Sequence, residues 1–240
     1  MNIKELKDRV LFALSVPKCV CCRKILSYGE KALCHECFTE LEDFSTRNCP
    51  KCSCVLNECD CSTAYLESHF VKRIIKCYRY INRKENSPAN ALIFSLKKDN
   101  REDVLSVCAD RLENAIKNAG IDPSEFIFIN IPRRKAAILE YGIDHSALLA
   151  EELAKRFGAE YISLLRSKAK KPQKSLETMD RLKNADFELI KEIDLTCKKV
   201  IIVDDIITSG ASMASAAAQV RSLGCKTIIA ATLAVAFIDE

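Results

Sequence analysis

Two adjacent carboxylates followed by a hydroxyl-rich turn form the strongest chemical signal in this sequence. Residues 199–213 read Lys-Val-Ile-Ile-Val-Asp-Asp-Ile-Ile-Thr-Ser-Gly-Ala-Ser-Met. The apolar run predicts a buried strand that leads into Asp204 and Asp205, and the turn at 208–212 contains Gly210 and leads into a predicted helix. Backbone N–H groups and hydroxyls at a helix start bind phosphate, while carboxylates accept hydrogen bonds from a diol. The segment therefore predicts a site for a pentose with a 5′-phosphate.

Other phosphate-binding motifs do not fit the chain. Its six glycines form neither a GxGxxG fingerprint nor a Walker A loop, which argues against dinucleotide-binding and P-loop folds. The simpler alternative is a capped strand-to-helix turn whose acids are only solvated. Two acids beside a hydroxyl–glycine turn are a costly arrangement without a ligand, so we favour the sugar-phosphate site.

Cysteines are concentrated at the start of the chain. Ten of the 14 fall within the first 61 residues. Eight of them form closely spaced pairs that suit metal ligands, and these are Cys19, Cys22, Cys34, Cys37, Cys49, Cys52, Cys59 and Cys61. Two thiolates in one tight turn can enter the same tetrahedron, and two such turns complete a four-sulfur zinc site. The spacing predicts one or two structural zinc ions.

The cellular compartment decides between metal ligands and disulfides. An apolar stretch near the start follows Glu5 and Asp8, without the positive region and cleavage site of a signal peptide. We therefore expect a short amphipathic helix there, a cytoplasmic protein and reduced, metal-binding cysteines. A disulfide framework or an iron–sulfur cluster is the alternative. Cys21 and Cys54 are surplus and could replace a ligand, whereas we expect His35 to be a solvent-facing spacer.

The rest of the chain alternates between predicted strands and helices. Helices are predicted over 88–98, 102–118, 145–157, 180–189 and 213–223, and strands over 69–81, 126–131, 161–165, 200–203 and 227–237. This order predicts an α/β fold in which helices cover both faces of a parallel sheet, with ligands at the carboxyl ends of the strands. We divide the chain where the cysteines end, into a cysteine-rich module (residues 1–62) and a body (residues 63–240).

Overall composition sets wide bounds on the function. The chain has 240 residues, of which 48% are hydrophobic and 29% charged, as in an ordinary globular protein. No apolar run approaches the length of a membrane span. The net charge of +4 is compatible with a nucleic-acid partner without requiring one.

Basic residues near predicted strand and helix ends suit a polyphosphate ligand. Lys97 and Lys98 close a predicted helix, and Arg133 and Arg134 follow a strand that stops at a proline. Five more cations lie between residues 166 and 174, where anion or nucleic-acid contact and a plain solvated surface are equally good interpretations.

Segment 199–213 resembles the phosphoribosyl-pyrophosphate (PRPP) motif of type I phosphoribosyltransferases at each position of the motif. The resemblance implies that Asp204 and Asp205 hold the ribose hydroxyls. It implies a 5′-phosphate loop made of Thr208, Ser209, Gly210, Ala211 and Ser212. It also implies that Mg²⁺ accompanies PRPP and that, in an enzyme, a nucleophile would displace pyrophosphate from the ribose.

Cysteine pairs followed by such a body are similar to the ComF family, which is linked in bacteria to natural competence and the uptake of single-stranded DNA. The resemblance is carried by the cysteine pairs, Leu96-Lys97, Ile131-Pro132, Lys171-Pro172-Gln173 with Leu176 and Arg181, and the Asp-Asp motif. The family usually shows Arg-Gly-Phe-Asn-Gln where this chain has Tyr141-Gly142-Ile143-Asp144-His145, and a glycine near Asp99 and Asn100. We therefore expect the sugar-phosphate site to be kept and leave turnover open.

The resemblance implies a function, and two alternatives stay beside it. We expect a protein that binds PRPP or a related sugar phosphate and acts in competence, with single-stranded DNA, a helicase or other competence protein, and a second copy of the chain as candidate partners. One alternative is a nucleotide-salvage phosphoribosyltransferase that transfers a pentosyl group to a free base. The other is a non-catalytic DNA-processing adaptor that uses the basic stretches 72–84 and 166–174.

Overall fold

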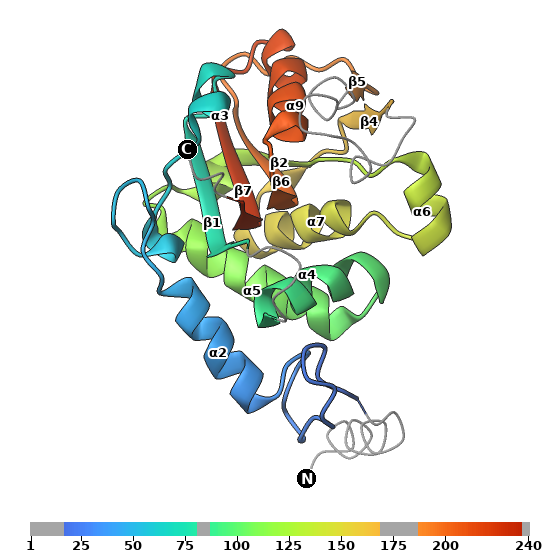
Figure 1. The fold of residues 1–240 in the computed structure, drawn as a ribbon. Coiled ribbons are helices and arrows are strands. Elements are labelled where there is room, and N and C mark those ends of the chain that lie inside the picture. The colour runs from blue at the N-terminus through green and yellow to red at the C-terminus, as the bar shows by residue number, and fades with distance from the viewer. Residues whose placement is uncertain (1–16, 81–86, 169–186, 237–240) are drawn as a thin grey trace.

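A five-stranded parallel sheet forms the centre of the molecule (Figure 1). A computed structural model describes residues 17–80, 87–168 and 187–236. The strand order is β1-β7-β6-β2-β3, and every neighbouring pair runs parallel. The strands are β1 (Arg73–Arg79), β2 (Phe126–Asn130), β3 (Glu160–Tyr161), β6 (Lys199–Ile207) and β7 (Thr227–Val235). A separate antiparallel pair consists of β4 (Leu165–Ser167) and β5 (Phe187–Leu189).

Helices cover both faces of the sheet, as the alternation of elements predicts (Figure 1). On one face lie α2 (His35–Ser45), α4 (Pro88–Lys98), α5 (Glu102–Asn118) and α7 (His145–Phe157). On the other lie α3 (Ala64–Ser68) and α9 (Ala211–Ser222). The remaining helices of the described residues are α6 (Lys135–Tyr141) and two single 3₁₀ turns, η1 (Leu56–Glu58) and η2 (Pro123–Glu125).

Side-chain alternation along the strands divides the core into two layers. In β6, Ile201 and Val203 pack among the residues of α4, α5 and α7, whereas Val200 and Ile202 pack with α9. Because both faces of the central strands are covered, β2, β6 and β7 are apolar along most of their length rather than alternating. The same alternation decides where the polar residues at the end of β6 point.

Local capping explains why several helices begin where the sequence predicts. Ser87 accepts a hydrogen bond from the Asn90 N–H at the start of α4, and Pro88 occupies the first turn. Asp144 caps α7 in the same way, and Gly158 ends α7 in the left-handed conformation. The predicted helices 88–98, 102–118 and 145–157 are confirmed at these bounds.

Other predicted elements differ from the structure. The strand expected over 161–165 is split into β3 and β4, and β6 continues four residues beyond the predicted end at 203. The helix expected over 180–189 is wrong for residues 187–189, which form β5, and its earlier residues lie outside the described part of the chain. The expected N-terminal amphipathic helix also lies outside it. Helices α2, α3 and α6 are not predicted from the sequence, because each is short and weakly periodic or lies among cysteines.

Candidate functional site

A cavity of about 710 Å³ opens at the carboxyl edge of the sheet, where an α/β fold is expected to bind its ligand. The ends of β2 and β6, helix α4 and the start of α9 contribute to its wall. The predicted diol, phosphate and pyrophosphate residues all line it, namely Asp204, Asp205, Thr208, Ser209, Gly210, Ala211, Ser212, Lys97, Lys98, Arg133 and Arg134. Segments more than 100 residues apart in sequence thus meet at one cavity.

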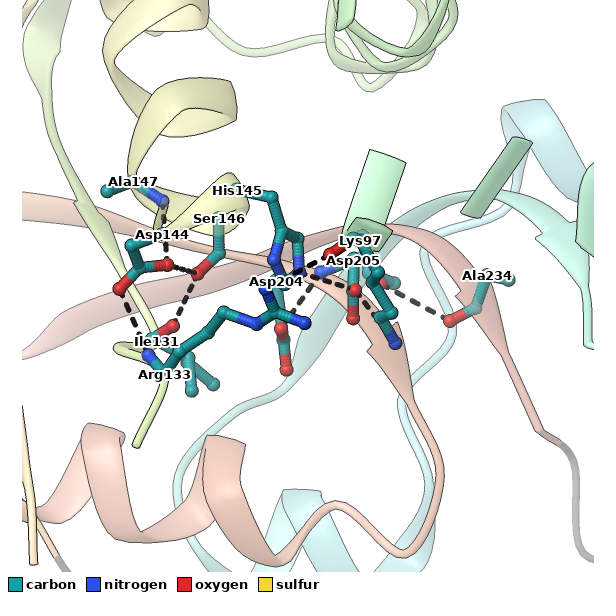
Figure 2. Close-up of polar contacts among 11 residues, drawn as sticks. Lys97, Ile131, Arg133, Asp144, His145, Ser146, Ala147, Asp204, Asp205 and Ala234 are labelled. Atoms are coloured by element: carbon teal, nitrogen blue, oxygen red, sulfur yellow. Dashed lines mark hydrogen bonds and ion pairs between the residues drawn. The ribbon is translucent and has the colours of Figure 1, made fainter. Parts of the chain in front are cut away.

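The two adjacent aspartates of β6 have different surroundings (Figure 2). Neighbouring residues on a strand point to opposite faces of the sheet. Asp205 points into the α4–α7 layer and is 3% exposed. Its Oδ2 accepts hydrogen bonds from His145 Nε2 at 2.6 Å and from Lys97 Nζ at 2.8 Å. Asp204 is half-buried on the other side of the strand and lines the cavity without such an ion pair among the described residues.

Electrostatics separates the two carboxyl groups further. Burial and the charge of Asp205 raise the pKa of Asp204 well above its usual value, against the opposing effect of Lys97. Burial also disfavours the charge of Asp205, but Lys97 and His145 outweigh it and hold the pKa of Asp205 below its usual value. Asp205 is therefore a fixed internal anion, and Asp204 is the carboxyl group that a ligand or a cation in the cavity would stabilise in its charged form.

The predicted pyrophosphate residues also divide into two kinds. Lys97 forms an ion pair with Asp205, and its side chain is 17% exposed. Arg133 donates to the Lys97 carbonyl oxygen at 3.2 Å, and its guanidinium lies 5.1 Å from the centre of the Tyr141 ring. Lys98 is exposed, and Arg134 is half-buried in the cavity lining. The structure therefore leaves three of the four cations to face an anionic ligand.

The turn between β6 and α9 has the shape expected of a phosphate loop. Gly210 adopts a left-handed conformation, with φ of +79°, and precedes the first residue of α9. A Cβ on Gly210 would lie 3.0 Å from Leu66 Cγ, so Leu66 of α3 packs directly against the loop. The N-terminus of a 12-residue helix, rich in hydroxyl neighbours, faces this cavity.

A second polar network fixes the opposite wall of the cavity (Figure 2). Asp144 accepts a hydrogen bond from the Arg133 N–H at 3.0 Å. The Ser146 hydroxyl is shared between two acceptors, the Asp144 carboxylate at 2.8 Å and the Ile131 carbonyl oxygen at 2.5 Å. The segment that follows β2 is therefore tied to the first turn of α7, which also carries His145.

His145 is the functional residue that sequence reasoning did not single out. It stands where the family usually has glutamine, and only that departure marked it. His145 is 4% exposed, and its Nδ1 has no hydrogen-bond partner in the described part of the chain. A glutamine side chain can also donate one hydrogen bond to a buried carboxylate, so the substitution keeps a donor for Asp205.

The cysteine pairs form two clusters, as the spacing predicts. One cluster joins Cys19, Cys22, Cys34 and Cys37, the other joins Cys49, Cys52, Cys59 and Cys61, and within each cluster all sulfur atoms lie within 4.8 Å of one another. A tetrahedral site with zinc–sulfur bonds of about 2.3 Å needs sulfur atoms about 3.8 Å apart. Both clusters fit a zinc ion on these grounds. Cys21 and Cys54 are in neither cluster, and His35 is exposed at the start of α2.

The first turn of each cluster has the same backbone geometry. Cys19 N–H donates to Lys24 O at 2.8 Å, and Cys49 N–H donates to Cys54 O at 2.7 Å. Arg23 and Ser53 occupy matching left-handed positions, with φ of +64° and +61°. The chain thus repeats one cysteine-bearing turn that could hold a metal, with a spacing of 30 residues between Cys19 and Cys49.

The comparison with known families identifies the part of the chain that carries the cavity. The model of the phosphoribosyl transferase domain matches residues 142–237, which include the Asp-Asp motif and the phosphate-loop candidate. This part of the chain is a phosphoribosyl transferase domain. Together with the parallel sheet, helices on both faces and a cysteine-rich start, the domain confirms the predicted fold class.

The resemblance to ComF proteins is confirmed over nearly the whole chain. The sequence is 24% identical over 224 residues to DNA utilization protein YhgH of Escherichia coli O157:H7, a match that covers 90% of this chain and 96% of that protein. The chain is therefore ComF-like, with two clusters able to hold zinc before a phosphoribosyl transferase domain.

Solved phosphoribosyltransferases are also similar to the chain. Purine phosphoribosyltransferase from Pyrococcus horikoshii is 21% identical, with 54% of this chain and 73% of that chain covered and a TM-score of 0.37. Orotate phosphoribosyltransferase from Aeropyrum pernix is 17% identical, with 65% of this chain and 78% of that chain covered and a TM-score of 0.37. Across the described ranges, no helix has both the length and the apolar character that crossing a bilayer requires.

Proposed function

We propose that the phosphoribosyl transferase domain binds PRPP, or a related sugar phosphate, together with Mg²⁺. The observation that carries the proposal is the shared cavity, which places the Asp204 carboxylate, the N-terminus of α9 and three basic side chains around one space of about 710 Å³. A phosphorylated pentose has a diol for the carboxylate and a 5′-phosphate for the loop. Its pyrophosphate would face Lys98, Arg133 and Arg134.

The chain's own residues would act mainly by positioning and by electrostatics. Asp204 would accept hydrogen bonds from the ribose hydroxyls, and the backbone N–H groups around Gly210 would donate to the 5′-phosphate. A bound Mg²⁺ would neutralise charge on the pyrophosphate. In a transfer reaction, the bond from the anomeric carbon to pyrophosphate breaks as a bond to the acceptor nucleophile forms, and Arg133 would stabilise the departing anion.

Isothermal titration calorimetry with PRPP and Mg²⁺ tests the binding proposal. Asp204→Asn should weaken binding at least tenfold, because an amide accepts fewer and weaker hydrogen bonds from the diol than a carboxylate does. Asp194→Asn is the matched control, since Asp194 is exposed and lies outside the cavity lining. Absence of heat with a folded, metal-loaded wild-type protein would remove the proposal.

Turnover is tested separately from binding. Release of pyrophosphate in the presence of individual free bases would favour a salvage phosphoribosyltransferase. Tight PRPP binding without pyrophosphate release for any base would favour a binding role of the domain in a DNA-processing protein.

A second candidate function, binding of single-stranded nucleic acid, is favoured by a cleft at the opposite edge of the sheet. This cleft of about 580 Å³ lies at the amino ends of the strands and is lined by Lys72, Arg73, Lys199, Arg221, Lys226 and Phe70, among others. Phe70 is 54% exposed in a left-handed conformation, with φ of +68°. The Arg221 guanidinium lies 3.8 Å from the centre of its ring. Cations beside an exposed aromatic ring suit a phosphate backbone and a stacked base.

The structure reduces the number of basic residues that are candidates for contact with DNA. Lys76 belongs to stretch 72–84 but is wholly buried and cannot contact DNA, which corrects the expectation for the whole stretch. Arg166 and Lys168 both lie near Glu188, at 3.3 Å and 3.9 Å, and the rest of stretch 166–174 lies outside the described residues. Asp122 and Glu125 also line the amino-edge cleft, and Glu125 pairs with Lys199. Lys72, Arg221 and Lys226 are therefore the residues to test.

Fluorescence anisotropy with a labelled single strand distinguishes specific use of this cleft from general attraction. Replacement of Arg221 and Lys226 by alanine should weaken binding of the single strand. It should also reduce the slope of log K against log salt concentration by about one to two. Replacement of the exposed Lys155 on α7 should change neither. Binding that does not respond to salt would count against the candidate. A role in competence, with a helicase or a second copy as partner, would follow only if single-strand binding is found.

A further inference from the structure

The second cysteine cluster packs against β1, the edge strand of the sheet that carries the sugar-phosphate cavity. Lys76 lies in the middle of β1 and is completely buried. Its Nζ lies 3.2 Å from Cys59 Sγ and donates to the carbonyl oxygens of Cys59 at 3.0 Å, Cys61 at 3.1 Å and Ile74 at 3.2 Å. Strand β1 therefore sends an ammonium group directly against one of the cluster's sulfur atoms.

A buried lysine needs a compensating charge, because transfer of an ammonium group out of water is costly. Its three N–H groups are shared among three carbonyl oxygens and Cys59 Sγ, and the carbonyl oxygens carry no net charge. Four thiolates around a divalent metal carry a net charge of −2, and an ammonium group hydrogen-bonded to one sulfur halves it. The geometry thus matches the outer-shell partners that tune metal sites.

The same cluster is connected to the phosphate loop on its other side. Helix α3 begins three residues after Cys61, and Lys51 of the cluster's first turn donates to Glu67 Oε1 of α3 at 2.6 Å. Leu66 of α3 is fully buried and fills the space beside Gly210. A shift of the cluster would move α3, and Leu66 would no longer hold the loop in its present position.

From these contacts we propose that metal occupancy of the Cys49–Cys61 cluster and ligand binding at the 208–212 loop are positively coupled. Lys76 is the positioning residue on the metal side, and Leu66 is the positioning residue on the phosphate side. The coupling to the 208–212 loop rests on the proposed sugar-phosphate function, whereas the role of Lys76 at the metal cluster does not. The coupling is reciprocal, so the sugar phosphate also strengthens retention of the metal.

Cadmium provides a probe that distinguishes the two clusters. Full-length protein loaded with ¹¹³Cd should give two resonances, and Cys52→Ser identifies the one from the second cluster, to which Cys52 belongs. Lys76→Met should lower the cadmium affinity of that cluster by about tenfold or more and leave the first cluster unchanged, as outer-shell changes do. Lys191→Met, at an exposed position away from both clusters, is the control. Equal cadmium affinity in Lys76→Met and wild type overturns the role of Lys76.

The coupling is measured on the wild-type protein, and Leu66→Ala serves as the comparison. A chelator competition taken to equilibrium with PRPP and Mg²⁺ present should show cadmium bound about tenfold more tightly by the second cluster. The cadmium affinity of the first cluster should change less. Leu66→Ala should remove this difference while both cadmium resonances persist. An unchanged cadmium affinity of the second cluster, with PRPP binding shown by calorimetry, overturns the coupling. Absence of PRPP binding instead refutes the proposed function and leaves the Lys76 test intact.

Discussion

At the scale of residues, the Asp-Asp pair is not a pair of equivalent groups. Strand alternation sends Asp205 into the helical layer, where Lys97 and His145 hold it, and leaves Asp204 at the cavity. The motif therefore has one carboxylate that organises the site and one that remains for a ligand. Arg133 follows β2 and donates a hydrogen bond to the Lys97 carbonyl oxygen in the last turn of α4, so it links these two walls of the cavity.

The raised pKa of Asp204 predicts a trade-off between stability and binding. A carboxyl group with a raised folded-state pKa stabilises the fold below its unfolded pKa, and this contribution is lost as the pH rises through the folded value. At neutral pH, Asp204→Asn should therefore raise the melting temperature by about 2–4 °C, for about 1 kcal/mol. Differential scanning fluorimetry across pH measures this. A lower melting temperature at pH 7 would contradict the assigned electrostatics.

The Asp205–His145 contact predicts different effects of two substitutions. His145→Ala removes a donor from a buried carboxylate and should destabilise the protein by about 1–3 kcal/mol in urea unfolding. His145→Gln keeps a donor and should cost less than half as much. The lowered pKa of Asp205 stabilises the fold above the unfolded pKa, and this is lost as pH falls through the folded value. The acid-side slope should therefore be shallower in His145→Ala, and identical slopes would refute the role of this hydrogen bond.

At the scale of elements, the β6–α9 turn and α3 form one unit. The turn needs a left-handed residue to bring the chain from the strand end into the helix, and Gly210 supplies it. Leu66 then packs where a side chain on this residue would otherwise lie. An apolar contact therefore holds the loop on the side of α3.

Two glycines with the same backbone conformation allow the cost of backbone strain to be measured separately from the cost of a side-chain contact. Gly210 and Gly142 have φ of +79° and +80°, but a methyl group added at Gly210 would meet Leu66, whereas one added at Gly142 would have no neighbour within 4 Å among the described residues. Gly142→Ala should cost about 1 kcal/mol, from backbone strain alone. Gly210→Ala should cost about 1–2 kcal/mol more and weaken PRPP binding. Thermal unfolding and calorimetry of both variants measure the difference. An equal loss of stability in the two variants would mean that the Leu66 side chain moves aside without cost.

At the scale of the whole molecule, the cysteine-rich part is hydrogen-bonded to the rest of the chain near each of its two clusters. Near the first cluster, the Ala32 N–H donates to Asp103 at the start of α5 at 2.9 Å, and Arg101 donates to the Lys18 carbonyl oxygen. Near the second cluster, Lys76 and a bridge between Cys61 and Arg73 join it to β1. Division of the chain at residues 62 and 63 stays a prediction, and these contacts show how much would be lost on separation.

Metal content tests the cluster assignment with a matched pair of exposed cysteines. Cys52 belongs to the second cluster, and Cys54, two residues later in the same turn, does not. Elemental analysis should find two zinc ions per chain in the wild type and in Cys54→Ser, and about one in Cys52→Ser. A strong chelator should lower the melting temperature of the wild type, because metal binding to the folded state adds to stability. Zinc retained in full by Cys52→Ser would refute the ligand set.

The sequence by itself determined the features that depend on local pattern. Helices α4, α5 and α7 follow from periodicity and caps such as Ser87 and Asp144, and the strand that leads to the Asp-Asp motif follows from a continuous apolar run. The membership of each cysteine cluster follows from close pairing along the chain, with two residues between the cysteines in three of the pairs and one residue between Cys59 and Cys61. The candidates for the cavity were also present in the sequence, because strand ends of a parallel sheet meet at one edge.

Only the tertiary structure decided which charged groups pair with one another. Lys97 and His145 are 108 and 60 residues away from Asp205 along the chain, and Lys76 is 17 residues beyond Cys59, so no local pattern connects them. Burial gives these contacts their importance, since a charge removed from water must find a partner wherever the fold brings one. Leu66 and Gly210 are likewise far apart in sequence and meet only through packing. Local pattern selects the elements, and packing assigns the roles.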